Sequence, residues 1–314
     1  MRRSRLVLRL LGVSALVAAG ALWLNTWNHV RRATAAFPPA GEFVVAGGTR
    51  LHYTSAGRGT PVVFLHGNPG SIRDFDEVGA RLARDHRVVA IDRPGHGHSG
   101  RTGDATPREQ AAIVHTLLQQ AEVTRPILVG HSWGGALALI YALEYPAEVA
   151  GLVLVGTRAA VQLRDPDLLS RIVRTPVLGR IAEWTVLLPI GRRVVEQGLT
   201  RVYAPDAVPG EELAAAHALW LRPGEMNATV WDAVNLQTAL EAYGPRFADL
   251  RAPASLIVGD RDELLTESRA LHQVLPHGEL RVLPNAGHMI IRTRPDAIAD
   301  AVRALARRAH AVQE

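Results

Sequence analysis

A serine at the centre of a Gly-x-Ser-x-Gly motif is the feature that most directly indicates chemistry. Ser132 stands between Gly130 and Gly134, after the apolar run 127–129 and before the small-residue helical pattern 136–140. A sharp turn from strand to helix exposes such a hydroxyl, and glycines flank it because a Cβ there would clash with neighbouring backbone. The free N–H groups at the start of the following helix point to where an oxyanion would form.

A serine hydroxyl becomes a good nucleophile only when a base accepts its proton, and that base needs an acid to orient it. Asp262 follows one apolar strand pattern and His288 follows the next. Asp260, two residues earlier, is the alternative acid. The order serine, aspartate, histidine, each at a strand end, predicts that three side chains from distant segments meet at one edge of a sheet.

The elements that would position these residues alternate between strand and helix patterns, which predicts an α/β fold with a doubly wound, mostly parallel sheet. Strand patterns cover 42–45, 50–54, 61–65, 87–91, 126–129, 151–155, 253–258 and 280–283. The first two are joined by Ala46-Gly47-Gly48-Thr49, which predicts a hairpin. Thr106, Pro107 and Glu109 predict a capped helix start.

From 158 to 248 the buried strand patterns stop, and helical patterns interrupted by prolines replace them. The prolines are Pro166, Pro176, Pro189, Pro205, Pro209 and Pro223. We interpret this segment as a helical cap inserted over the catalytic edge of the sheet. The predicted domain organisation is therefore 1–36 for an N-terminal anchor and linker, 37–157 and 249–314 for the two parts of the core, and 158–248 for the cap.

The N-terminal segment has the composition of a membrane anchor. Four arginines precede an apolar run at 10–24, two follow it, and Trp23 and Trp27 stand where an interfacial aromatic belt would lie. A cleaved signal peptide is the alternative, with 33–35 as the cleavage site. The polar spacer 25–32 argues for an uncleaved signal anchor, and the arginine bias places the catalytic body in the periplasm or outside the cell.

Net charge and cysteine content exclude several kinds of partner and site. The formal net charge is +5, but residues 1–40 hold six arginines and no acidic residue, so the remaining chain is close to neutral and no nucleic-acid partner is expected. The chain has no cysteine, which excludes disulfides, thiolate metal sites and a cysteine nucleophile.

Several ordered stretches together resemble the α/β-hydrolase superfamily, in its serine-nucleophile branch with an inserted helical cap. These stretches are 66–67, 92–99, 130–134, 144–146 leading into 151–155, 259–262 and 287–288. The resemblance implies a catalytic triad of Ser132, Asp262 and His288, with the acid at Asp262 rather than Asp260. It also implies an oxyanion hole formed by the backbone N–H groups of Asn68 and Trp133.

A zinc site and the activities of aspartate-nucleophile relatives are two alternatives to the serine hydrolase. His66, His96, His98 and His131 could suggest zinc, but each lies in a loop that the resemblance explains and none has a carboxylate at ligand-like spacing, so we predict no metal and no cofactor. The turn 66–70 is similar to that of epoxide hydrolases and haloalkane dehalogenases. Those relatives have an aspartate nucleophile where this chain has Ser132, which argues against both activities.

The expected function is a membrane-anchored serine hydrolase that cleaves an ester or related acyl bond of a small, apolar substrate through an acyl-enzyme. Hydrolysis of carbon–carbon, amide or thioester bonds and cofactor-free perhydrolysis use similar triads, and the sequence leaves them open. A non-catalytic, membrane-tethered binding protein is the alternative from another class. A probe that traps acyl-accepting serines separates the two classes.

Overall fold

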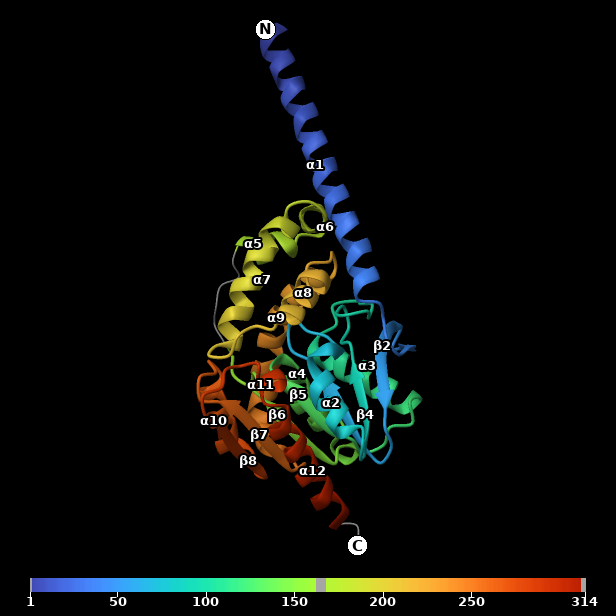
Figure 1. Ribbon diagram of the computed structural model, residues 1–314, viewed down its shortest axis with the longest axis vertical. Helices are drawn as coiled ribbons and strands as arrows, with labels where there is room; N and C mark the ends of the chain where they lie inside the picture. The colour runs from blue at the N-terminus through green and yellow to red at the C-terminus, as the bar shows by residue number, and fades with distance from the viewer. Residues whose placement is uncertain (1, 162–167, 312–314) are drawn as a thin grey trace.

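The structure is a computed structural model that describes residues 2–161 and 168–311. Residues 162–167, which include Pro166 of the predicted cap, lie outside the described residues. The described chain forms one eight-stranded sheet with helices on both faces, a group of helices beyond one edge, and a long N-terminal helix that projects from the body (Figure 1).

The sheet has the strand order β1-β2-β4-β3-β5-β6-β7-β8. Its strands are β1 Glu42–Ala46, β2 Thr49–Ala56, β3 Thr60–Leu65, β4 His86–Ile91, β5 Ile127–His131, β6 Gly151–Val155, β7 Ala254–Gly259 and β8 Gly278–Leu283. Strands β4 to β8 and β3 run parallel, whereas β1 and β2 are antiparallel additions. The predicted doubly wound, mostly parallel sheet is confirmed.

The predicted hairpin at the sheet edge is also confirmed. β1 pairs with β2 in antiparallel register up to the pair Ala46 and Thr49, which leaves Gly47 and Gly48 as a two-residue turn. Their φ angles are +55° and +76°, a left-handed pair that matches the twist of the strands and that glycine adopts without a steric penalty.

Two layers of helices bury the central strands. The helices of the core are η1 Ile72–Phe75, α2 Asp76–Leu82, α3 Pro107–Gln120, α4 Trp133–Glu144, η2 Pro146–Glu148, α10 Leu265–Val274, α11 Ile290–Thr293 and α12 Pro295–Ala311. The short helix η3 Gly244–Asp249 lies at the end of the predicted cap, before β7. Helices α3, α4 and α10 contribute to the apolar cluster on one face, and α2 and α12 contribute to the cluster on the other. All residues of β5 and β6 are buried, because both faces of these strands are covered.

Helix α3 begins as the sequence predicts. The Thr106 side chain accepts a hydrogen bond from the backbone N–H of Glu109, and the Glu109 carboxylate accepts one from the Thr106 N–H. This reciprocal pair satisfies two N–H groups that the first turn leaves without a helical partner.

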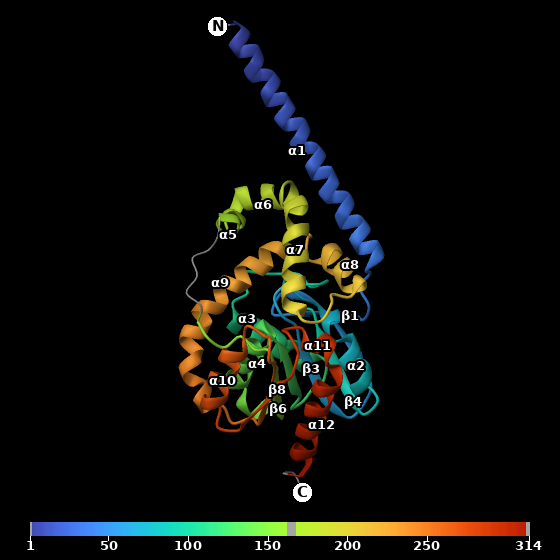
Figure 2. The same ribbon diagram turned by 60° about the vertical axis from the view of Figure 1, so that its left-hand side comes forward.

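The segment between β6 and β7 is helical, and we call its helices the cap helices. They are α5 Leu168–Val173, α6 Pro176–Trp184, α7 Leu187–Tyr203, α8 Gly210–Leu219 and α9 Glu225–Tyr243. They lie between the sheet and the outer part of the N-terminal helix (Figures 1 and 2).

The N-terminal helix α1, Arg2–Ala36, is continuous through the polar spacer that the sequence places after the apolar run. Its last turns pack on the body, where Thr26 and Ala33 are buried, while apolar side chains nearer the N-terminus, such as Leu10, Leu16 and Val17, are exposed. The span Arg5–Ala36 is long and apolar enough to cross a membrane. The structure therefore contains one N-terminal helix with the properties of either an anchor or a signal sequence.

Candidate active site

Ser132 occupies the turn between β5 and α4, with φ +53° and ψ −115°. A non-glycine residue rarely adopts a positive φ, and such strain persists only where surrounding contacts impose it. A Cβ on Gly130 would overlap the backbone of Gly134, and a Cβ on Gly134 would overlap the carbonyl of His66. The two glycines thus allow β5, α4 and the end of β3 to approach each other around Ser132.

The turn that follows β3 lies directly beside Ser132. A Cβ placed on Gly67 would be 3.4 Å from the Ser132 Cβ. Among the residues that the structure describes, the backbone N–H groups of Asn68 and Trp133 have no hydrogen-bond partner. Two unpaired N–H groups at one serine are what an oxyanion hole requires.

His288 and Asp262 form a hydrogen-bonded pair at the ends of β8 and β7. The His288 Nδ1 is 2.9 Å from Asp262 Oδ2, and Asp262 Oδ1 accepts a hydrogen bond from the Leu264 N–H. Burial alone raises the pKa of Asp262, but the hydrogen bond and positive charge of His288 outweigh it, so this pKa lies below its usual value. An ionised carboxylate only accepts, so Nδ1 is the nitrogen that donates to it, and in the neutral form of the imidazole Nε2 is the one free to accept a proton.

Gly156, at the end of β6, places this pair next to the serine. The N–H of Ser132 donates to the Val155 carbonyl at 2.9 Å, which fixes the serine backbone beside Gly156. A Cβ on Gly156 would lie 2.8 Å from Asp262 Oδ2 and 3.0 Å from His288 Nδ1. Within the described part of the chain, neither the Ser132 Oγ nor the His288 Nε2 makes a hydrogen bond. Such contacts commonly tighten only when substrate binds.

Asp260, the alternative acid, lies elsewhere. Its Oδ1 accepts a hydrogen bond from the Ala286 N–H at 3.1 Å, and its side chain is exposed. This contact holds the turn that precedes His288. Among the two aspartates, the structure brings Asp262 to the imidazole and gives Asp260 a role in the loop.

The four histidines considered for zinc contact protein atoms in separate ways. His66 Nε2 accepts from the Arg93 N–H, and His98 Nε2 is 3.1 Å from the Phe37 carbonyl. His131 Nε2 is 3.2 Å from the His288 carbonyl, and burial together with the nearby His288 lowers the pKa of His131 to about 3. His131 is therefore neutral near pH 7.

His96 belongs to a buried charge network that joins the core to α9. Its ring nitrogens lie 2.8 Å from Glu225 and 3.0 Å from Asp232, both on α9. Arg93, fully buried, pairs with Asp232 at 2.6 Å, and Arg101 pairs with the other oxygen of Asp232 at 2.8 Å. Burial raises the pKa of Asp232, but Arg93 and the other cations outweigh it and hold that pKa well below the usual range.

Arg93 also connects this network to the candidate oxyanion turn. Its Nη2 donates to the Gly67 carbonyl at 2.7 Å, its Nε donates to the His66 carbonyl at 3.0 Å, and its guanidinium lies over the Trp133 ring. The His66 Nδ1 also donates to the Gly67 carbonyl, at 2.8 Å. Because C=O and N–H point in opposite directions across a trans peptide, fixing this carbonyl aims the Asn68 N–H the other way.

Sequence reasoning did not find Asp232 or Glu225. Both lie on α9, inside the cap, and nothing near them in the sequence marks an acidic side chain for burial. The partner residues Arg93 and Asp232 are 139 positions apart. The only local signal would have been an aspartate on the face of α9 that Leu236 and Leu240 share.

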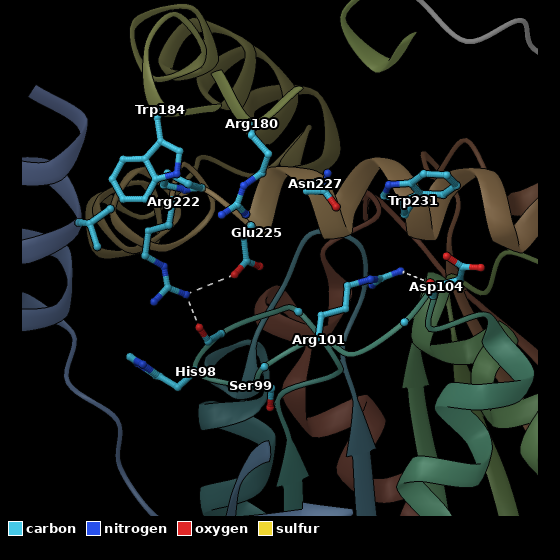
Figure 3. Close-up of a pocket in the computed structure, with 17 residues that line it drawn as sticks. His98, Ser99, Arg101, Asp104, Arg180, Trp184, Arg222, Glu225, Asn227 and Trp231 are labelled. Carbon is cyan, nitrogen blue, oxygen red and sulfur yellow. Dashed lines mark hydrogen bonds and ion pairs between the residues drawn. The ribbon is translucent and has the colours of Figure 1, made fainter. Parts of the chain in front are cut away.

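A cavity of about 610 Å³ lies between the end of α1, the cap helices and the loop after β4 (Figure 3). Its wall includes three arginines, Arg101, Arg180 and Arg222, together with Trp184 and Trp231. Arg101 also belongs to the buried charge network. The three candidate catalytic side chains are not among the residues that line this cavity.

Comparisons with known proteins agree with this architecture. The chain is 27% identical over 262 residues to the dihydrolipoyllysine-residue acetyltransferase component of the acetoin cleaving system of Pseudomonas putida, covering 80% of this chain and 65% of that protein. It is 28% identical over 262 residues to the 2-hydroxy-6-oxo-2,4-heptadienoate hydrolase of Pseudomonas putida, covering 80% and 90%.

Among solved structures, a thermophilic esterase from Thermogutta terrifontis superposes with a TM-score of 0.70 at 22% identity, covering 86% of this chain and 100% of that one, a likeness of fold. The sequence profile of a family described as alpha/beta hydrolase fold matches residues 60–219. The chain belongs to the alpha/beta hydrolase fold family and is an enzyme of the hydrolase type.

Proposed function

We propose that this hydrolase uses Ser132 as its nucleophile and cleaves an ester or related acyl bond of a small, apolar substrate through an acyl-enzyme. The observation that carries the proposal is the positive φ of Ser132 at the turn between β5 and α4, beside the hydrogen-bonded pair of His288 and Asp262. The strained backbone of Ser132, between two glycines that no larger residue could replace without overlap, exposes the serine hydroxyl.

The reaction follows from the protonation states. The free Nε2 of His288 accepts the Ser132 proton as Oγ bonds to the acyl carbon, and it then gives that proton to the departing group as the substrate bond breaks. Water attacks the resulting acyl ester while Nε2 accepts one of its protons, and Nε2 then gives that proton to Oγ as the Ser132–acyl bond breaks and the acid product leaves. Asp262 holds the imidazole in the required tautomer and stabilises its cationic form.

The negative charge that develops on the carbonyl oxygen is stabilised by the N–H groups of Asn68 and Trp133. Both are free of other partners in the described structure. The N–H of Trp133 is at the first position of α4, where the helix dipole adds to its effect. Removing one such donor costs about 10²- to 10³-fold in kcat in enzymes of this kind.

Labelling with a fluorophosphonate probe tests the nucleophile. The full-length protein in detergent micelles should react, whereas Ser132→Ala and His288→Ala should not, and Ser55→Ala, an exposed serine of β2, serves as the matched control. Undiminished labelling of a folded Ser132→Ala variant would refute the proposal. Absence of labelling in the wild type would favour a non-catalytic binding protein.

We also propose that residues 1–36 anchor the enzyme in a membrane, with the body in the periplasm or outside the cell. The exposed apolar side chains of α1 and the arginines before them support this placement. Burial of Thr26 and Ala33 against the body supports retention of the segment over its cleavage. Intact mass of the membrane-extracted protein tests it, since loss of residues 1–35 would establish processing.

The domain organisation proposed with this anchor assigns 37–157 and 249–314 to the hydrolase core and 158–248 to the cap. The cap helices extend from Leu168 to Tyr243, within that range. The His288 N–H donates to the Val202 carbonyl of α7 at 2.9 Å, so the cap also supports the loop that carries the proposed base.

A further inference from the structure

Helix α6 exposes large apolar side chains on its outer face. Val177 is 69% exposed, Leu178 59% and Ile181 56%, while Gly179 and Ala182 on the other side of the helix are buried. These outward positions are spaced as one face of a helix. The exposed side is therefore as apolar as the side that packs on the protein.

Further exposed apolar residues lie at the start of α7 and along it. Val186, Ile190 and Val194 follow each other at intervals of four residues and are all exposed. Outside α1, comparable exposure among the described residues is found at Leu168 on α5, which packs against α6, and otherwise at Phe43, Val45, Val161 and Val274. We define the apolar face as Val177, Leu178, Ile181, Val186, Ile190 and Val194. Clustering of this kind marks an interaction surface, because scattered exposed residues are ordinary.

The apolar face lies where α1 leaves the body. Trp23 of α1 stacks on Trp184 of α6 with ring centroids 6.0 Å apart. Both views show α5 and α6 at the end of the body from which α1 projects (Figures 1 and 2). Most of the exposed apolar residues of α1 precede this contact, so α6 is level with the end of the apolar run that is nearest to the body.

The charges around the apolar face are predominantly basic. Segment 168–203 contains six arginines and two glutamates, and one glutamate, Glu183, is buried. Arg180, Arg192 and Arg193 are exposed on the helices that carry the apolar face. Apolar residues flanked by arginines are typical of helices that lie in the headgroup region of an anionic bilayer.

We propose that the apolar face is a membrane-docking surface, which inserts into the surface of the anionic phospholipid bilayer that α1 enters. Docking places the outer cap helices in the headgroup region, with the rest of the cap between the membrane and the edge of the sheet that carries the candidate site. The substrate class that fits this placement is an apolar acyl ester that partitions into the membrane. This second statement rests on the proposed function, whereas the docking surface rests on the geometry of α1, α6 and α7.

The lack of cysteine makes the docking surface directly testable. Val177→Cys and Ile181→Cys each place one nitroxide on the apolar face of the full-length protein, reconstituted in nanodiscs containing phosphatidylglycerol. Val274→Cys is the control, because it is 44% exposed and lies on α10, far from α6 in both views (Figures 1 and 2). Power saturation with lipid-soluble oxygen and with a water-soluble nickel chelate then reports the surroundings of each probe.

The docking surface predicts that oxygen collisions exceed nickel collisions at the two α6 probes, with the reverse at Val274. Nickel collisions that dominate at all three positions would overturn it. Strong spin–spin broadening between chains at Val177 would overturn it as well, because a second copy of the chain would then be the occupant of the apolar face.

Activity tests the substrate class separately. A variant with Val177→Ser, Leu178→Ser and Ile181→Ser should lose about tenfold in turnover of a long-chain ester carried in vesicles, and retain turnover of a short-chain soluble ester. Val45→Ser, an exposed residue of β1, is the control. Equal loss on both esters, or loss on neither, would refute the membrane substrate. Turnover that survives in Ser132→Ala would refute the proposed function and leave the nitroxide result standing.

Discussion

Substitution Arg93→Lys tests whether the buried charge network positions the oxyanion turn. Arginine reaches the Gly67 carbonyl, the His66 carbonyl and the Asp232 carboxylate at once, through donors on three nitrogens. Lysine keeps the charge but offers its donors from a single atom, so it cannot span these groups. The variant should therefore retain the pair with Asp232 and release the peptide that carries the Asn68 N–H.

The expected magnitudes follow from the contacts that are lost. Leaving a buried carbonyl without its donor costs about 1–3 kcal/mol in the free energy of unfolding. Removing an oxyanion donor outright costs about 10²- to 10³-fold in kcat. Since His66 Nδ1 still donates to the Gly67 carbonyl, we expect a smaller loss, of about 10- to 100-fold, with KM little changed.

The assay measures kcat and KM for p-nitrophenyl butyrate together with the thermal midpoint by circular dichroism. Arg101→Lys is the matched control, because Arg101 pairs with the same aspartate at 2.8 Å but donates its other hydrogen bonds to the Pro94 and Asp104 carbonyls. It should lower stability and leave kcat unchanged. A folded Arg93→Lys variant with wild-type kcat, or equal kcat losses in both variants, would show that Arg93 has only a structural role.

Three further predictions concern single residues. Asp262→Asn should lower kcat by about 10³- to 10⁴-fold through loss of the imidazole tautomer, whereas Asp260→Asn should change kcat little, and equal effects would contradict the assignment of the acid. Burial and Arg93 lower the pKa of His96, but its carboxylate partners outweigh them and raise it above the usual value. Protonated His96 therefore stabilises the fold below about pH 6.5, and this contribution is lost as the pH rises through the folded-state pKa. The wild type should have a larger free energy of unfolding than His96→Asn at pH 6, and this difference should become smaller by pH 9. A difference that stays constant would refute the prediction. Gly134→Ala should abolish fluorophosphonate labelling, because its Cβ overlaps the His66 carbonyl; wild-type labelling would show that the turn adapts.

Local sequence determined much of the scaffold. The hairpin turn requires left-handed φ angles at Gly47 and Gly48, and the start of α3 requires the reciprocal hydrogen bonds of Thr106 and Glu109. Apolar runs of five or six residues mark strands buried on both faces, which is why the parallel sheet could be predicted. The Gly-x-Ser-x-Gly motif likewise indicates its own turn. A Cβ at either Gly130 or Gly134 would overlap neighbouring backbone, so the close approach around Ser132 requires both glycines.

How distant segments meet depends on the packing of the whole fold. This packing placed Asp262 rather than Asp260 against the imidazole, since both follow the same strand and only the approach of the last loop separates them. It paired Arg93 with Asp232, 139 positions away, and so joined the cap to the candidate oxyanion turn. Periodicity reports which side of an element is apolar, not what covers that side. Whether an apolar helix face, such as that of α6, is buried or left open depends on packing between elements, which the sequence pattern alone does not contain.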